Sequence, residues 1–325
     1  MIKRSMTGFA ILLLAAPFTL YAKQVPAPLV DTNWLAANLD DVVILDVRAD
    51  TRSFTATPVF KKDKKTGKKK LVRVGGHIPG ARLVNYKQVR ARQTINGRQV
   101  DKMLPNKTRF EKLIQAAGVN KDSAIIIVSK GLNSGDVTMA TRLYWQLKYF
   151  GHDNMAILNG GTAQWIKEGR KVSTRAVKPA RGNWVATAER KEILATSEDV
   201  AKAMQDKSAQ LVDTRTIDLY LGTWRKGYVY EKGHIPGAKN LSHLTLVKPG
   251  MGAKILPVEE LQQLAIAMGV DPARPTITYC NSGHLASGSW FVMHELMGNK
   301  KAKLYDGSMH EWTLEKRPVK AMVME

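Results

Sequence analysis

The stretch Gly-His-Ile-Pro-Gly-Ala occurs twice without change, at residues 76–81 and 233–238. Two further pairs of segments repeat in the same order around these copies: VILDVR (43–48) with QLVDTR (210–215), and NGGTAQW (159–165) with DGSMHEW (306–312). A chain that repeats several segments in one order is built from copies of one structural unit. The sequence therefore predicts two similar domains.

Each repeat alternates short apolar runs with segments of helical character. β-Branched runs at residues 124–128 and 276–279 are each followed by a loop and a helix-like segment, at 139–150 and 286–297. This alternation produces βαβ units and hence a parallel sheet with helices on both faces. We predict an α/β protein with two such domains and a linker between them: residues 23–176, 177–190 (linker) and 191–325.

Residues 1–22 have the pattern of a secretory signal peptide. Lys3 and Arg4 precede an apolar run at residues 9–20, and Ala22 is a small residue at the expected cleavage point. The run is shorter than the ~20 residues that span a bilayer, which disfavours a permanent anchor. We expect a periplasmic or secreted protein with no stable membrane insertion after cleavage.

Basic residues dominate the charge of the 325-residue chain, whose formal net charge is +22. For an exported protein this favours small anionic molecules or an anionic surface as partners over nucleic acid, although general solubility explains the charge equally well. The densest basic run, KKDKKTGKKK at residues 61–70, predicts an exposed hairpin or loop tip. A hydrophobic content of 44% excludes a disordered chain.

Cys280 is the only cysteine, which excludes an intramolecular disulfide and any multi-cysteine metal site. It follows the predicted strand at 276–279, and ligand sites of open α/β sheets lie at the carboxyl ends of strands. A tight loop there turns backbone N–H groups inward, and the next helix adds positive charge, so a thiolate is favoured. Gly283 suits such a bend. The alternative is an inert buried thiol.

These features resemble the two-domain rhodanese family, the thiosulfate and 3-mercaptopyruvate sulfurtransferases. The features are Asp-x-Arg after a strand, the repeated Gly-His-Ile-Pro-Gly-Ala, the cysteine loop and a terminal Asp-Gly-x-x-x-x-Trp. The resemblance covers nearly all of the chain after residue 22. It implies that Cys280 takes sulfur from an anionic donor (thiosulfate, 3-mercaptopyruvate or polysulfide) as a persulfide. The acceptor would be cyanide, a thiol or a sulfur-accepting protein, and no metal or organic cofactor is implied.

Two other functions remain possible on this fold. Phosphatase-like relatives have a longer cysteine loop closed by an arginine, and no arginine follows Cys280 in its loop. A non-enzymatic sulfur-relay or partner-binding module is the second alternative. The first domain has Ser129 at the place of Cys280, and the resemblance implies that this domain is catalytically silent.

The expected substrate-binding residues come from the cysteine loop and from two further positions. Both branches of the family usually carry an anion-binding arginine where this chain has Leu219. Arg225 and Lys226, a few residues further on, are the candidates to replace it. The mercaptopyruvate branch has a histidine at the position of Lys102, which we expect to face Cys280; a solvated loop lysine is the alternative. The loop residues are Asn281, Ser282, Gly283, His284 and Leu285. His284 is expected either to bind substrate or tune Cys280, or to face solvent.

The remaining repeated residues are expected to be structural. They are the paired histidines His77 and His234, the buried ion pairs Asp46–Arg48 and Asp213–Arg215, and the core anchors Trp165 and Trp312.

Overall fold

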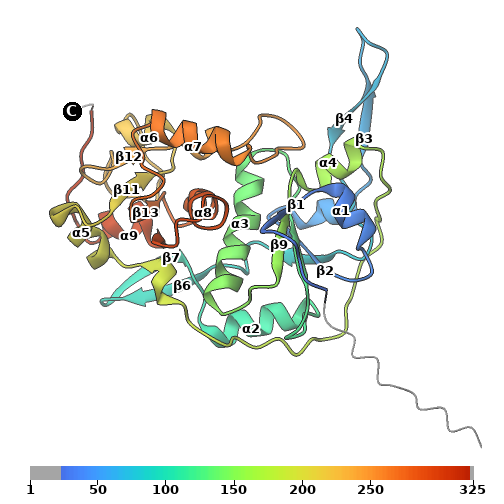
Figure 1. The fold of residues 1–325 in the computed structure, drawn as a ribbon, viewed down its shortest axis with the longest axis horizontal. Coiled ribbons are helices and arrows are strands. Elements are labelled where there is room, and N and C mark those ends of the chain that lie inside the picture. Colours follow the sequence, from blue (N-terminus) through green and yellow to red (C-terminus); the bar gives the residue numbers. More distant parts are fainter. Residues whose placement is uncertain (1–22, 323–325) are drawn as a thin grey trace, which may run out of the picture.

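The computed structural model describes residues 23–322, and the predicted signal peptide at 1–22 lies outside the described residues. Two five-stranded sheets, each with only parallel pairs, have corresponding strand orders (Figure 1). In order across the first sheet the strands are β1 (Leu29–Val30), β9 (Met155–Leu158), β8 (Ile125–Val128), β2 (Val43–Arg48) and β5 (Arg82–Asn85). In the second sheet they are β10 (Leu194–Ala195), β14 (Ala302–Tyr305), β13 (Thr276–Tyr279), β11 (Gln210–Asp213) and β12 (Lys239–Asn240). This confirms the predicted fold class.

Helices cover both faces of the first sheet because its central strands are apolar on both sides. Along β8, Ile125 and Ile127 join a core with α2 (Lys107–Ala116) and α3 (Ser134–Tyr149). The alternate residues Ile126 and Val128 join a second core with α1 (Thr32–Ala37) and α4 (Gly161–Lys167). The second sheet is covered in the same way, by α5 (Ser197–Asp206) and α9 (Ser308–Leu314) on one face and by α7 (Val258–Ala267) and α8 (Ala286–Phe291) on the other.

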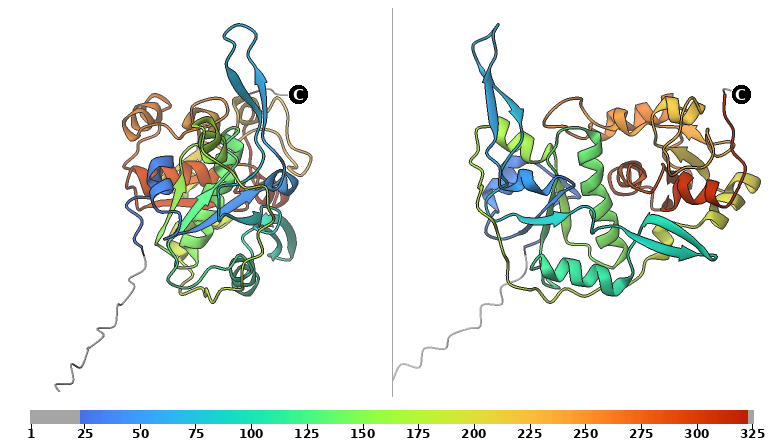
Figure 2. Two further views of the ribbon diagram at one scale, coloured as in Figure 1. Left: turned by 90° about the vertical axis from the view of Figure 1, so that its right-hand side faces the viewer. Right: turned by 180° about the vertical axis from the view of Figure 1, so that it is seen from behind.

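The two domains dock through α3 and α8, which lie side by side at the centre of the molecule (Figures 1 and 2). α8 continues as a π-helical turn, η4 (Val292–Leu296). One apolar core runs through this interface and contains residues of both domains. Polar contacts add to it, such as the 2.8 Å hydrogen bond between the hydroxyls of Thr141 and Ser287. The carboxyl ends of both central strands are therefore held close to the domain interface.

Residues 177–190 contain no helix or strand and pack along the first domain. Trp184 is buried there, and its backbone N–H donates to the Val119 carbonyl at 3.1 Å. The shorter elements of the chain are η1 (Thr51–Phe54), η2 (Lys191–Ile193), α6 (Ile217–Leu221) and η3 (His243–Leu246). Within residues 23–322, no helix combines the length and apolar character needed to cross a bilayer.

Two antiparallel hairpins extend from the first domain. β3 (Val59–Lys62) and β4 (Lys69–Arg73) form the exposed basic hairpin, which projects away from the body of the molecule (Figure 2). This confirms the prediction from residues 61–70. β6 (Ala91–Ile95) and β7 (Arg98–Met103) form a second hairpin that was not predicted, and it reaches α9 of the second domain.

The repeated residues have equivalent structural roles in the two domains. Arg48 donates to both carboxylate oxygens of Asp46 and to the Gly76 carbonyl, and Arg215 makes the same bonds to Asp213 and Gly233. His77 stacks on Phe54 with ring centres 3.7 Å apart, and His234 stacks on Tyr220 at 3.9 Å. The indole N–H groups of Trp165 and Trp312 each donate to a backbone carbonyl at 2.8 Å. These positions agree with the predicted structural roles, because each side chain is buried and makes these contacts inside its own domain.

Candidate active site

Cys280 follows the last residue of β13, and its side chain is a buried free thiol, 1% exposed. The N–H of Ser282 lies 3.4 Å from the sulfur and points at it. A backbone N–H aimed at sulfur stabilises negative charge there, because it donates without any rearrangement. The loop is therefore suited to hold an anionic sulfur.

Ser308, which was not among the predicted site residues, organises the cysteine loop. Its hydroxyl oxygen accepts hydrogen bonds from the N–H groups of Cys280 and Gly283, each at 3.0 Å, and donates to the Tyr305 carbonyl at 2.9 Å. The hydroxyl oxygen is also 4.0 Å from the Cys280 sulfur. Two loop N–H groups expected to face the sulfur are thus bound to Ser308.

Ser308 has a left-handed backbone, with φ of 52°. A non-glycine residue in this conformation costs on the order of 1–2 kcal/mol. The strain places the hydroxyl under the loop, where it satisfies two buried donors.

Arg142 of α3 crosses from the first domain to the cysteine loop. Its Nη1 donates to the Asp306 carboxylate and, at 3.1 Å, to the Gly283 carbonyl. Asp306 also accepts a hydrogen bond from the Leu104 N–H at 2.6 Å. Gly283 has φ of 66°, and a Cβ there would lie 2.3 Å from Asp306 and 2.5 Å from Arg142. Only glycine therefore fits between the loop and this ion pair.

Several buried donors of the first domain have no hydrogen-bond partner among the residues that the structure describes. They are Nε and Nη2 of Arg142, Nε of Arg90 and the hydroxyl of Tyr86. Burial raises the pKa of Tyr86, and four nearby charged groups also act on it: Arg90, Arg142, Cys280 and Asp306. Buried donors left unsatisfied are costly and need an explanation. A bound anion would satisfy them.

Lys102 lies at the domain interface, at the end of the β6–β7 hairpin. Its Nζ is 3.0 Å from the centre of the Tyr228 ring, and Tyr228 hydrogen-bonds to Ser282. Burial lowers the pKa of Lys102, Arg90 lowers it further, and the charge of Cys280 acts in the opposite direction.

The other predicted site residues make different contacts. The Asn281 side chain accepts from Arg215 at 3.5 Å, and Leu285 packs on the shared core. His284 lies against the first domain, with Nε2 3.0 Å from the Thr138 hydroxyl and 3.2 Å from the Gly135 carbonyl. Burial lowers the pKa of His284 to about 3, so the ring is neutral. Arg225 is exposed and donates to the Val229 carbonyl at 2.6 Å, while Leu219 is buried.

The sequence contained a signal for two of the unpredicted residues. Asp306 and Ser308 stand where the first repeat has Asn159 and Gly161. A comparison of the two repeats would therefore have drawn attention to both residues. Arg90 and Arg142 had no such signal. Among residues 23–322, no three His, Cys, Asp or Glu side chains lie close enough together to hold a metal ion.

Comparisons with known proteins agree with this geometry. The rhodanese-like domain model matches residues 31–168 and again residues 196–315. The chain is 31% identical to thiosulfate sulfurtransferase of Gallus gallus, covering 73% of this chain and 78% of that protein. It is 29% identical to the sulfur carrier protein TtuD of Thermus thermophilus, covering 88% and 94%.

A solved structure shows the same two-domain arrangement. SseA from Escherichia coli, described as a 3-mercaptopyruvate sulfotransferase, superposes with a TM-score of 0.67 at 26% identity, covering 87% of this chain and 98% of SseA. The family model thus matches twice, at the two repeats, and covers most of the chain. The chain belongs to the rhodanese family of sulfurtransferases and carries two rhodanese-like domains in tandem.

Proposed function

We propose that this protein moves sulfane sulfur from a small anionic donor to a thiophilic acceptor through a persulfide on Cys280. The observation that carries the proposal is the buried Cys280 thiol at the end of β13 with the Ser282 N–H directed at its sulfur. The names of the relatives support sulfur transfer in general. The donor and the intermediate are part of the proposal.

The reaction has two displacement steps. The Cys280 thiolate attacks the outer sulfur of the donor, and the bond from that sulfur to the rest of the donor breaks with its electron pair leaving on the donor. With thiosulfate the products are the persulfide anion and sulfite. Cyanide or a thiolate then attacks the outer persulfide sulfur, and the Cys280 thiolate leaves. The Ser282 N–H stabilises the anionic sulfur in both states.

The donor's anionic group is proposed to bind the cations of the first domain. Arg142 contacts the cysteine loop at Gly283, and both Arg142 and Arg90 have buried donors without a partner among the described residues. They would supply the charge that Leu219 cannot. Lys102 adds a third cation across the interface. Because the Coulomb attraction grows with ligand charge, this arrangement favours a dianionic donor such as thiosulfate or a polysulfide.

Two measurements test this proposal. Intact mass after donor exposure reports persulfide formation, and cyanide turnover with thiosulfate, 3-mercaptopyruvate and polysulfide ranks the donors. Lys102→Met is expected to lower the rate with thiosulfate severalfold and to affect the monoanionic 3-mercaptopyruvate less. Lys87→Met, an exposed lysine of the same domain, is the matched control. Equal losses for both donors would contradict the role given to Lys102.

A sulfur carrier is the second candidate function, favoured by the similarity to TtuD. A carrier would load one sulfur on Cys280 and release it slowly to cyanide but rapidly to a partner protein. Rapid multiple turnover with cyanide distinguishes the enzyme from the carrier.

The proposal includes export from the cytoplasm, which rests on the sequence of residues 1–22 alone. Mass spectrometry of the protein from its native host is expected to show a chain that begins at Lys23. A mature chain that retains Met1 would contradict export by cleavage.

A further inference from the structure

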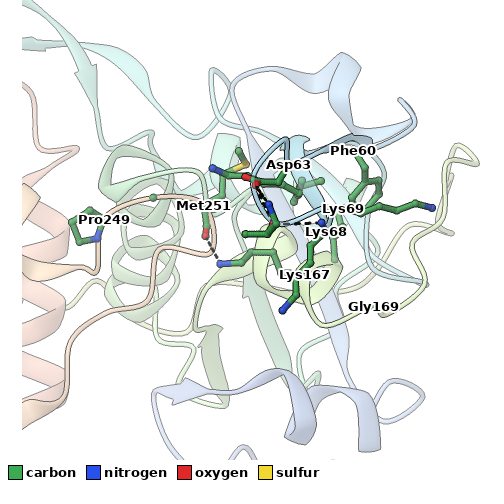
Figure 3. A pocket seen from close by; sticks show the side chains of 13 residues that line it. Phe60, Asp63, Lys68, Lys69, Lys167, Gly169, Pro249 and Met251 are labelled. Atoms are coloured by element: carbon green, nitrogen blue, oxygen red, sulfur yellow. Dashed lines mark hydrogen bonds between the residues drawn. The ribbon is translucent and has the colours of Figure 1, made fainter.

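A groove lies between the β3–β4 hairpin and a loop of the second domain (Figure 3). Its volume is about 810 Å³. Lysines 68–70 and Phe60 line it on the hairpin side, and Lys167 at the end of α4 donates to the Met251 carbonyl on the other side at 3.0 Å. Leu71 and Ile166 are buried apolar residues that also line it. The groove thus combines apolar side chains with a basic rim.

The β3–β4 hairpin is densely positive, and its cations form no ion pairs with the described residues. Between residues 59 and 73 there are eight cations, and the structure describes no carboxylate within ion-pair distance of any of them. Asp63, the one acid in the segment, accepts hydrogen bonds from the N–H groups of Lys65 and Thr66 at the turn. These bonds lower the pKa of Asp63, and the bond from the Thr66 N–H has the largest effect. The acid therefore serves the turn.

Like charges face each other across the hairpin. Lys61 is opposite Lys70, and Lys62 is opposite Lys69. Like charges directly opposite each other destabilise a strand pair. An external anion bound along the hairpin would offset this repulsion.

Both strands of the hairpin have an unpaired edge, because they form a sheet of two strands only. An open edge can add an extended segment through backbone hydrogen bonds. The lysines repel a second copy of this hairpin and attract an acidic strand. Phe60 is 44% exposed and Val72 is 38% exposed, so apolar side chains of such a segment would also find contacts. We propose that this groove binds an extended acidic segment of a partner protein.

The shape of the site favours a polypeptide over other polyanions. The exposed apolar residues are at the base of the hairpin, while its tip is Thr66 and Gly67. A flat membrane surface would meet the polar tip and not the groove. Nucleic acid binding commonly uses arginine and stacked aromatic rings, whereas seven of the eight cations here are lysines and Phe60 is the one aromatic residue of the hairpin.

The test uses a short fluorescent peptide of glutamate and leucine, with a glutamine-for-glutamate peptide as the ligand control. The full mature chain carries Lys68→Glu, Lys69→Glu and Lys70→Glu together. The matched control changes three exposed lysines of α2 and the loop that follows it, Lys107, Lys112 and Lys121, to Glu. α2 lies at the far side of the first domain from the β3–β4 hairpin (Figure 1). Both variants have the same net charge, and both are expected to melt near the wild-type temperature because the lysines are exposed.

The hairpin variant is expected to bind the acidic peptide at least ~10-fold more weakly, and the control variant to bind it within about twofold of wild type. Phe60→Ser changes no charge and is expected to weaken binding about threefold, which separates seating in the groove from general attraction. Equal losses in the two triple variants would overturn the proposal. So would tighter binding of a single-stranded DNA oligomer or of phosphatidylglycerol vesicles than of the peptide. These readouts involve no sulfur transfer, so they are independent of the proposed function.

Discussion

The loops after the two central strands, β8 and β13, have similar backbones but different side chains around them. Ser129 and Cys280 occupy the same place, because the Thr162 N–H donates to the Ser129 carbonyl as the Met309 N–H donates to the Cys280 carbonyl. The residue before each donor is left-handed, with φ of 59° at Gly161 and 52° at Ser308. A Cβ at Gly161 would lie 2.3 Å from the Ser129 carbonyl oxygen. The backbone of the first loop therefore occupies the space that a serine side chain at position 161 would need.

The other domain covers each loop in a different way. In the first domain, the Gly131 carbonyl accepts hydrogen bonds from the N–H groups of Gly252 and Ala253, which close the loop with backbone. In the second domain, the cover is the Arg142 side chain paired with Asp306. Ser289 of the second repeat corresponds to Arg142, and Asn159 of the first repeat corresponds to Asp306. A few side chains at the domain interface thus separate a candidate sulfur-binding loop from a filled one.

The largest expected difference between the loops is in sulfur loading. Cys280→Ser is expected to abolish the mass gain of one sulfur atom after donor exposure, because the chain has no second thiol. Ser129→Ala is expected to load and turn over as wild type. A Cys280→Ser protein that still gains sulfur would refute the mechanism, and loss of activity in Ser129→Ala would refute the silence of the first domain.

The Arg142–Asp306 pair is expected to give the largest difference in stability. Arg142→Met leaves a buried carboxylate without its cation, which costs about 3–5 kcal/mol of unfolding free energy. Ser289→Ala, at the corresponding place, is expected to cost less than about 1 kcal/mol. Urea unfolding measures both. The double variant Arg142→Met/Asp306→Asn should recover part of the loss; no recovery would mean that the arginine acts by packing alone.

Glu311 is a buried titratable group of the second domain, and the first domain has Gln164 at the corresponding place. Burial raises the pKa of Glu311 from an ordinary 4.5 to about 7, and the like charges of Glu315 and Asp306 add to this. The folded state therefore binds this proton more tightly than the unfolded state. The contribution of protonated Glu311 to the free energy of unfolding is fully present below pH 4.5. It is lost as the pH rises through 7, by up to about 3 kcal/mol.

Glu311→Gln tests this sign. The variant is expected to be more stable than wild type at pH 8 and similar to it at pH 5, as measured by urea unfolding at both values. A variant that loses the same stability at both values would show that the carboxylate is ionised and satisfied in the fold.

Ser308 is expected to give the smallest effect, and it separates strain from hydrogen bonding. Ser308→Ala keeps the left-handed strain and leaves two buried N–H groups without their acceptor, so it should lose about 1–3 kcal/mol. The rate of persulfide formation should fall on the order of tenfold, because the loop is less well positioned. Ser308→Gly imitates the first domain; it should recover the part of the stability that comes from backbone strain, but not the rate, because the hydroxyl acceptor is still missing. Full recovery of the rate by glycine would show that the hydroxyl has no positioning role.

The sequence alone determined the architecture because repeats and strand patterns are local properties. The apolar runs that became β8 and β13, the repeated Asp-x-Arg pairs and the basic hairpin were all readable from neighbouring residues. The position of Cys280 after a buried strand also identified the candidate nucleophile. The β6–β7 hairpin was missed because its residues, Ala-Arg-Gln-Thr-Ile and Arg-Gln-Val-Asp-Lys-Met, alternate too weakly in hydrophobicity to predict strands.

Tertiary structure alone decided which side chains of the first domain reach Cys280. Arg142 lies 164 residues from Asp306 in the chain, and nothing in the pattern of α3 distinguishes it from a lysine or arginine that faces solvent. Its place follows from the docking of α3 on α8, which buries that face and brings the guanidinium under the cysteine loop. Helical periodicity predicts that a face will be buried, but the partner of that face is fixed by the packing of the whole molecule.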